Sequence, residues 1–221
     1  LRRGKYREAE EAFRAVLSAQ PQNAQAYNFL GIVMGIQNRF GEAIESFKES
    51  LRLKPDLTDS RTRLAELYQI RGDLPEARSE LEKAILFLED RDGPEAQSLE
   101  DKVNVIDEQI EVKTLVDRAN KEIENENIDA AVASLEEAIR VEPKSALIYF
   151  NLGNLLARKN RFDLAESAFK KAIEIEPNYT EAYQRLGLVY EHERFWGRAK
   201  DQYEKALTTP AAKSPSVKEA L

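Results

Sequence analysis

Residues 152–177 read LGNLLARKNRFDLAESAFKKAIEIEP and contain the pattern on which the interpretation of the whole chain depends. A Gly stands near the start, an Ala in the middle, a Phe four residues after that Ala and a Pro at the end. Apolar residues recur at spacings of three, four and seven on both sides of a polar break at residues 159–161. The stretch therefore predicts two short amphipathic helices joined by a turn.

The same pattern recurs along the chain at a fixed interval. The central Ala recurs at intervals of 34, 34, 54, 34 and 34 residues, at Ala9, Ala43, Ala77, Ala131, Ala165 and Ala199. A large apolar residue follows four positions later, at Phe13, Phe47, Leu81, Leu135, Phe169 and Tyr203. Another precedes the Ala by three positions, at Tyr6, Phe40, Leu74, Ile128, Phe162 and Trp196. A single helix pair cannot bury its apolar face, so we expect neighbouring pairs to stack.

Two further columns set the spacing of the helices and the ends of the units. A small residue stands twelve positions before the central Ala, where two helices can approach closely, at Gly31, Ala65, Ala119, Gly153 and Gly187. Proline cannot continue a helix interior. It closes the unit at Pro21, Pro55, Pro143 and Pro177.

In these columns the chain resembles the tetratricopeptide repeat family, whose unit is a 34-residue helix–turn–helix. The resemblance implies an all-α fold, a right-handed superhelical solenoid of such units, here interrupted by one long helix. The N-terminal block, 1–91, would hold a half repeat at 1–23 and repeats at 24–57 and 58–91. The C-terminal block, 112–209, would hold repeats at 112–145, 146–179 and 180–209. We expect 1–23 to hold the end of a first helix and a whole second helix, 210–221 to be a tail or the start of a capping helix, and both ends to be cut from a longer array.

The 54-residue interval leaves twenty extra residues, 92–111, between the two blocks. Pro94 suits the first position of a helix, and no helix breaker follows it before Asn125. The sequence therefore predicts one long helix over 94–124, about 45 Å long. Its first half has an apolar stripe formed by Leu99, Val103, Ile106 and Ile110. Two interpretations stay open: a solvated helix that spaces the blocks, or an exposed stripe that docks a partner or a second copy of the chain.

The composition argues against a nucleic-acid-binding protein, a disulfide-bonded protein and a membrane-spanning protein. The formal net charge of −7 argues against a nucleic-acid partner held by phosphate neutralisation, and the absence of Cys excludes disulfides and thiolate metal sites. No apolar run approaches the roughly 18 residues of a membrane span. We expect a soluble protein of the cytoplasm or the periplasm, between which the sequence does not decide.

No candidate catalytic, cofactor or metal site stands out. The one histidine, His192, lies in the polar stretch YEHERF, where a solvated surface position is expected rather than a catalytic relay. No Gly-rich phosphate cradle is present. We therefore expect no enzyme, no cofactor and no metal.

The resemblance also implies where a partner would bind. In this family the first helix of each unit lines a concave groove that holds a peptide or a helix. The groove positions that we select are Asn28, Phe29, Ile32, Ile36, Arg63, Asn120, Phe150, Asn151, Asn154, Arg158, Gln184, Arg185 and Leu188. Amide side chains can donate to and accept from a peptide backbone, and arginines can pair with carboxylates. The alternative, that Phe29 and Ile36 merely pack between first helices, stays open.

These expectations point to a non-enzymatic adaptor that binds a partner in its groove and acts in assembly of a larger complex. The main alternative is a homo-oligomer that forms through the 94–111 stripe or the array ends; a regulatory domain of an enzyme is a further one. A chaperone co-factor that grips a terminal carboxylate is also conceivable, since Asn120, Asn151 and Arg185 match that subtype. Val116 and Glu181, however, stand where that subtype has its two lysines.

Overall fold

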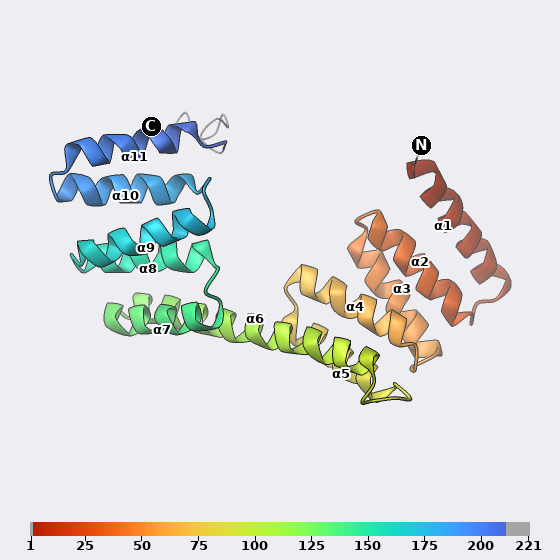
Figure 1. Cartoon of the computed structure of the whole chain (residues 1–221). Helices are drawn as coiled ribbons and strands as arrows, with labels where there is room; N and C mark the ends of the chain where they lie inside the picture. Colours follow the sequence, from red (N-terminus) through yellow and green to blue (C-terminus); the bar gives the residue numbers. More distant parts are fainter. Residues whose placement is uncertain (1, 211–221) are drawn as a thin grey trace. The chain divides into compact units, whose positions relative to one another are not determined.

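The computed structural model describes the backbone of residues 2–210 and the side chains of residues 5–210 (Figure 1). The predicted all-α fold is confirmed, because this part of the chain forms eleven helices and no strand. The helices are α1 (Arg2–Ala19), α2 (Ala24–Ile36), α3 (Phe40–Leu53), α4 (Thr58–Arg71), α5 (Leu74–Leu86), α6 (Pro94–Glu124), α7 (Ile128–Val141), α8 (Ala146–Arg158), α9 (Phe162–Ile175), α10 (Thr180–His192) and α11 (Trp196–Thr208). Apart from Pro210, the predicted tail or capping helix at 210–221 lies outside the described residues.

The helices gather into two compact units that divide between Ile110 and Glu111. In the N-terminal unit, α1 to α5 pack in sequence, each on the next. In the C-terminal unit, α7 to α11 do the same, as the stacked ribbons of that unit show in Figure 1. Each unit has its own apolar core, with Phe47 and Leu81 fully buried in the first and Leu135 and Phe169 in the second.

The small-residue column lets the two helices of a pair approach each other. A β-carbon at Gly153 would lie 2.7 Å from Cε1 of Phe169, and one at Gly187 would lie 2.5 Å from Cε1 of Tyr203. In each case the aromatic ring from the second helix occupies the space that a side chain on the first would need. The expected role of this column, close helix approach, is confirmed.

The turn within each pair uses the same backbone conformation at the same column. Five residues before the central Ala, the chain turns through positive φ at Asn38 (60°), Gly72 (84°), Glu126 (60°), Asn160 (56°) and Arg194 (62°). A left-handed residue after the last helical turn redirects the chain so that the second helix can fold back. Glycine adopts this conformation without strain and asparagine tolerates it, whereas glutamate and arginine do not favour it.

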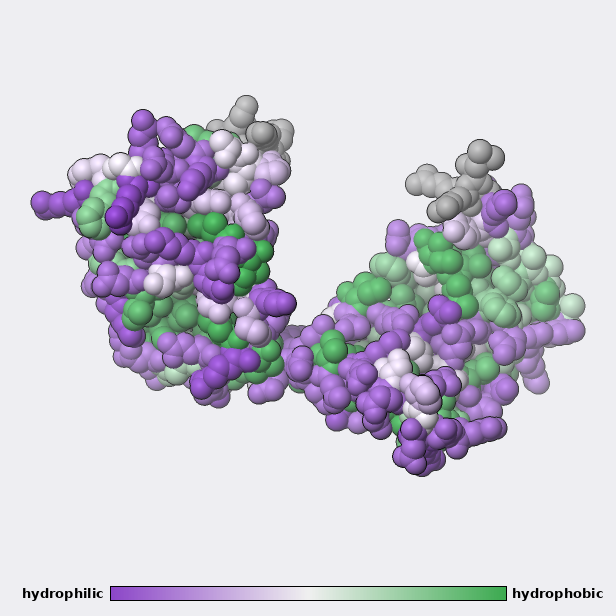
Figure 2. Space-filling model, viewed as in Figure 1, coloured by the Kyte–Doolittle hydropathy of each residue, from purple (hydrophilic) through white to green (hydrophobic). Residues whose placement is uncertain are grey.

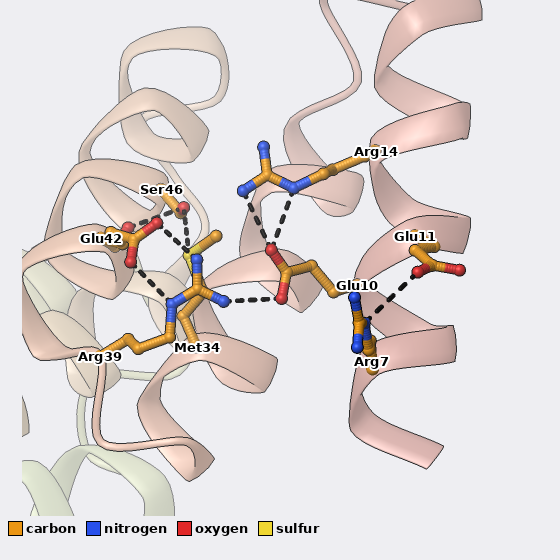
Figure 3. Close-up of polar contacts among 8 residues, drawn as sticks. All are labelled: Arg7, Glu10, Glu11, Arg14, Met34, Arg39, Glu42 and Ser46. Atoms are coloured by element: carbon orange, nitrogen blue, oxygen red, sulfur yellow. Dashed lines mark hydrogen bonds and ion pairs between the residues drawn. The ribbon is translucent and has the colours of Figure 1, made fainter. Parts of the chain in front are cut away.

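Helix α1 is one continuous helix from Arg2 to Ala19, and no separate end of a first helix precedes it in the described residues. An ion-pair cluster joins it to the next pair (Figure 3). Arg39, at the start of α3, donates from Nη1 to Oε2 of Glu10 on α1 at 2.6 Å and from Nε and Nη2 to the Glu42 carboxylate, also at 2.6 Å. Arg14 donates from Nε to the other oxygen of Glu10 at 3.1 Å. The pKa of Glu10 is lowered because the hydrogen bond from Arg39 outweighs the effect of burial.

The long helix predicted over 94–124 is present as α6, with those bounds. Its first half, however, does not carry the exposed stripe that the sequence suggested. Leu99 and Ile106 are buried in the core of the N-terminal unit, and Val103 and Ile110 pack against that core. Of the two interpretations left open, the exposed stripe that docks a partner or a second copy was therefore wrong, because these four residues pack on the core.

The reason is that α4 and α5 need a helix to cover them, and α6 supplies it. Three polar contacts along this side of α6 fix its position. Gln69 Nε2 donates to Oε1 of Gln109 at 2.9 Å. Arg78 Nε donates to Oδ1 of Asp107 at 2.6 Å, and Lys102 Nζ donates to Oε1 of Glu66 at 3.1 Å. The first half of α6 thus takes the place that the first helix of a following repeat would take.

The second half of α6 begins the C-terminal unit with a polar contact where other pairs have apolar ones. Arg118 Nε donates to the buried Oγ of Ser134 on α7 at 2.8 Å, and that hydroxyl donates to Oε2 of Glu122 at 2.7 Å. Leu115 and Ala119 are buried beside this network. The network satisfies Ser134, which is inaccessible to water.

Candidate partner-binding pockets

The first helices of successive pairs approach each other within each unit, α2 with α4 and α8 with α10, more closely than the second helices do. This is the geometry of the inner side of a curved stack. Apolar surface reaches solvent on both units among the hydrophilic residues, as Figure 2 shows. Five of the exposed large apolar residues lie on these first helices: Phe29, Ile36, Ile70, Leu147 and Leu188.

One pocket, which we call the N-unit pocket, lies between α2 and α4 and has a volume of about 270 Å³. It is lined by Gly31, Ile32, Gly35, Ile36, Phe40, Phe47, Arg63, Glu66, Leu67 and Ile70. Ile36 and Ile70 are 52% and 65% exposed, so two aliphatic side chains stand open to solvent at its rim. Of the groove residues that we selected, it brings together Ile32, Ile36 and Arg63.

A second pocket, the C-unit pocket, lies between α8 and α10 and has a volume of about 410 Å³. It is lined by Asn154, Ala157, Arg158, Phe162, Phe169, Arg185, Leu188, Val189 and His192. It therefore brings together four selected groove residues, Asn154, Arg158, Arg185 and Leu188. Neither arginine forms an ion pair or a side-chain hydrogen bond within the described part of the chain.

His192 is exposed, as expected, but its ring also stacks on Phe162 with centroids 3.9 Å apart and planes inclined by 29°. The stack fixes one wall of the C-unit pocket. The repeat places both His192 and Ile70 at groove positions, because they stand 34 residues after Arg158 and Ile36, although neither is in the selected set.

Asn28 does not serve the role that we expected for it. It is only 3% exposed, and its Nδ2 donates to Oδ2 of Asp59 at 2.9 Å while its Oδ1 accepts from Ser60 Oγ at 2.9 Å. The amide is thus consumed in joining α2 to α4 and is not available to a peptide backbone. Arg63 is also engaged, since its Nε donates to Oδ1 of the same Asp59 at 2.9 Å.

The two selected aromatic residues, Phe29 and Phe150, both pack against other aromatic rings. Phe29 is exposed but stacks on Phe13 of α1, with ring centroids 5.4 Å apart. Phe150 is half-buried between Phe169 and Tyr179, with centroid distances of 5.9 Å and 5.0 Å. The structure thus favours a packing role for Phe150 and leaves Phe29 partly open.

The remaining selected amides stay near the surface and lie outside both pockets. Asn120 is exposed, and Asn151 and Gln184 are half-buried. None of the three has a side-chain hydrogen bond within residues 5–210.

Among the described residues, no cluster of three or more His, Asp or Glu side chains could hold a metal ion. None of the helices in residues 2–210 has both the length and the apolar character to cross a bilayer.

Sequence profiles described as tetratricopeptide repeat match most of the chain. One matches residues 1–58 and 116–180, a second matches 36–103 and a third matches 168–208. No curated protein matches the sequence.

Several solved structures resemble the fold at low sequence identity. The P58(IPK) TPR domain is 19% identical with a TM-score of 0.51, over 99% of this chain and 60% of that one. The APC/C hetero-tetramer Cut9-Hcn1 is 16% identical with a TM-score of 0.50, over 98% of this chain and 45% of that one. MamA protein is 23% identical with a TM-score of 0.43, over 83% of this chain and 90% of that one. At these identities the likeness extends to the fold alone.

Proposed function

Because the chain belongs to the tetratricopeptide repeat family, we propose that it is a non-enzymatic scaffold for protein–protein interaction. In this proposal a peptide or helix of a partner lies along the first helices of the repeats, and the chain acts as an adaptor in assembly of a larger complex. Stacked helical repeats create extended surfaces that suit such binding.

The observation that carries the proposal is the pair of pockets between first helices, each with apolar side chains exposed at its rim. Burying an apolar side chain from water is favourable by about 25 cal/mol per Å². Ile36, Ile70 and Leu188 remain exposed to water in the isolated chain, so a partner that buries them would be stabilised by this effect. Alternating aliphatic and polar groups also give a groove both affinity and orientation.

The proposal is tested by comparing two leucines of similar exposure on different faces. Leu188, on α10 at the C-unit pocket, is 48% exposed, and Leu164, on α9 outside it, is 44% exposed. Proteins that co-purify with the tagged chain are identified by mass spectrometry for the wild type and for the Leu188→Asp and Leu164→Asp variants. We expect Leu188→Asp to lose a partner that Leu164→Asp retains.

Equal retention of every partner by both variants, each shown by circular dichroism to be folded, would contradict a role for the first-helix face. Phe150→Ala is not used in this test, because Phe150 packs against Phe169 in the core and its removal would affect folding as well.

A further inference from the structure

The two pockets occupy equivalent positions in their units. Each of the nine residues that line the C-unit pocket stands 122 positions after a residue that lines the N-unit pocket, as Arg158 does after Ile36. The same shift relates the central alanines Ala43 and Ala165. The pockets are therefore two copies of one feature of the repeat, and their differences reflect side-chain chemistry rather than different places in the fold.

The floors of the two pockets are alike. Phe162 and Phe169 in the C-unit pocket correspond to Phe40 and Phe47, and Val189 corresponds to Leu67. Both pockets thus offer an apolar base against which a side chain of a partner can pack. This shared apolar base gives neither pocket a preference for charge.

The rims differ in a consistent direction. Ile36 and Ile70 at the rim of the N-unit pocket become Arg158 and His192 at the rim of the C-unit pocket. Ile32 becomes Asn154, while the one acid of the N-unit pocket, Glu66, becomes Leu188. The C-unit rim therefore gains hydrogen-bond donors and loses its only carboxylate.

Both pockets contain an arginine at the same repeat position, Arg63 and Arg185, but only Arg63 is ion-paired. In the N-unit pocket Arg63 is paired with Asp59 at 2.9 Å, and Glu66 is paired with Lys102 at 3.1 Å, so the charges there are already matched. In the C-unit pocket the residue equivalent to Asp59 is Glu181, and it forms no ion pair with Arg185 within the described residues. Arg158 and Arg185 both remain without a carboxylate.

We infer that the C-unit pocket selects a side-chain carboxylate of an acidic peptide segment followed by an apolar residue, whereas the N-unit pocket takes an uncharged aliphatic side chain. This inference rests on the proposed function and names the chemistry that each pocket recognises. Guanidinium groups bind a carboxylate through two parallel hydrogen bonds, and the Asn154 amide adds a donor. The apolar residue of the partner packs on the phenylalanine floor beside Leu188.

The test uses the full chain, labelled with ¹⁵N, and short peptides blocked at both ends. The acidic probe is acetyl-Ser-Glu-Leu-Ser-amide, and the matched neutral probe replaces its Glu with Gln. Chemical-shift changes of the Asn154 side-chain amide and of the backbone around Arg158 report binding. We expect the neutral probe to bind about tenfold more weakly than the acidic one.

Two variants locate the effect. Arg158→Ile gives the C-unit rim the residue of its N-unit equivalent, and we expect about a tenfold loss of affinity for the acidic probe. Arg140→Ile removes the same charge from an exposed position on α7 outside the pocket and should leave the affinity unchanged. Equal affinity for the acidic and neutral probes, or an unchanged affinity in Arg158→Ile, would overturn the inference.

A further probe, acetyl-Ser-Gln-Leu-Ser with a free C-terminus, separates a side-chain carboxylate from a terminal one. Binding of this probe alone would overturn the preference for a side-chain carboxylate. The proposed function fails separately, if Leu188→Asp and Leu164→Asp retain the same co-purifying proteins, whatever the probes do. Binding of acidic and neutral probes with equal strength would refute only the charge preference and leave groove binding in place.

Discussion

A β-carbon on Gly31 would lie 2.8 Å from Cε1 of the Phe47 ring, closer than two carbon atoms can stand without a shift. Phe47 is fully buried in the core of the N-terminal unit, so its ring has little room to move away. We expect Gly31→Ala to destabilise the protein by about 1–2 kcal/mol, because overpacking outweighs the gain in helix propensity. Urea unfolding followed by circular dichroism measures the change.

The control for this prediction lies one turn further along the same helix. A β-carbon on Gly35 would meet no atom within 4 Å, so Gly35→Ala should instead raise stability by about 0.5–1 kcal/mol. If both variants change stability in the same direction, the close contact between α2 and α3 does not determine the choice of glycine at position 31.

The left-handed turns make a second prediction. Glu126 and Arg194 adopt φ values of 60° and 62°, which strain a residue with a β-carbon, and neither side chain has a partner in the described residues to compensate. We expect Glu126→Gly and Arg194→Gly each to raise the free energy of unfolding by about 0.5–1 kcal/mol. Gly72→Ala, at the same column with φ of 84°, should lower it by about 1 kcal/mol. Chemical unfolding of the three variants measures their free energies of unfolding. A loss of stability in both glycine variants would refute the strain argument.

The repeat columns were sufficient to predict the fold class and the close contacts at Gly153 and Gly187, because these depend on the spacing within one helix pair. The long helix could be predicted from Pro94 and the lack of a helix breaker before Asn125, which are also local features. The columns were not sufficient for the first half of α6. The stripe that contains Leu99 and Ile106 looked free because the next repeat had been counted from residue 112, which left α5 without a cover. Whether α6 covers α5 depends on how α4, α5 and α6 pack together. A 34-residue pattern describes only two helices and carries no information on such a contact.

The candidate site shows the same limit at the level of side chains. The columns placed both Asn28 and Arg158 on the groove side, at different positions along their first helices, yet Asn28 is hydrogen-bonded to Asp59 and Ser60 whereas Arg158 lines a pocket. The difference depends on which polar residues of the adjacent first helix come within reach. That in turn depends on the rotation of α4 against α2, which the sequence pattern does not specify.

The role of Asn28 leads to a third prediction. Replacing it by Ala would leave the carboxylate of Asp59 and the buried Ser60 hydroxyl without one of their partners. We expect Asn28→Ala to destabilise the protein by about 1–2 kcal/mol, since two hydrogen bonds between α2 and α4 are lost while Ser60 keeps its bond to Ser50 and Asp59 keeps its bond to Arg63. Asn120→Ala removes an exposed amide that has no partner in residues 5–210, and it should change stability by less than about 0.5 kcal/mol. Thermal unfolding of both variants tests the contrast, and equal effects would show that the Asn28 network is not structural.

The contact between Arg39 and Glu10 gives a prediction for pH. The hydrogen bond from Arg39 holds the pKa of Glu10 below its ordinary value of 4.5, so the folded state favours the ionised carboxylate. Because the folded pKa is the lower one, this contribution to stability is present above pH 4.5 and is lost as the pH falls through the folded value. Glu10→Gln should lower the thermal midpoint at pH 7, by on the order of 2 °C, and the difference from the wild type should shrink at acid pH.

The control for the pH prediction is on the same helix. Glu11 faces Arg7 at 3.7 Å in an exposed pair, which contributes little in water, so Glu11→Gln should leave the midpoint at pH 7 nearly unchanged. Differential scanning calorimetry between pH 3 and pH 7 measures all three proteins. Protonation of Glu10 at acid pH removes its charge and weakens its pairing with Arg39, so the difference in thermal midpoint should shrink there. If the difference between Glu10→Gln and the wild type stays constant from pH 7 to pH 3, the ionised form of Glu10 does not hold α1 to α3.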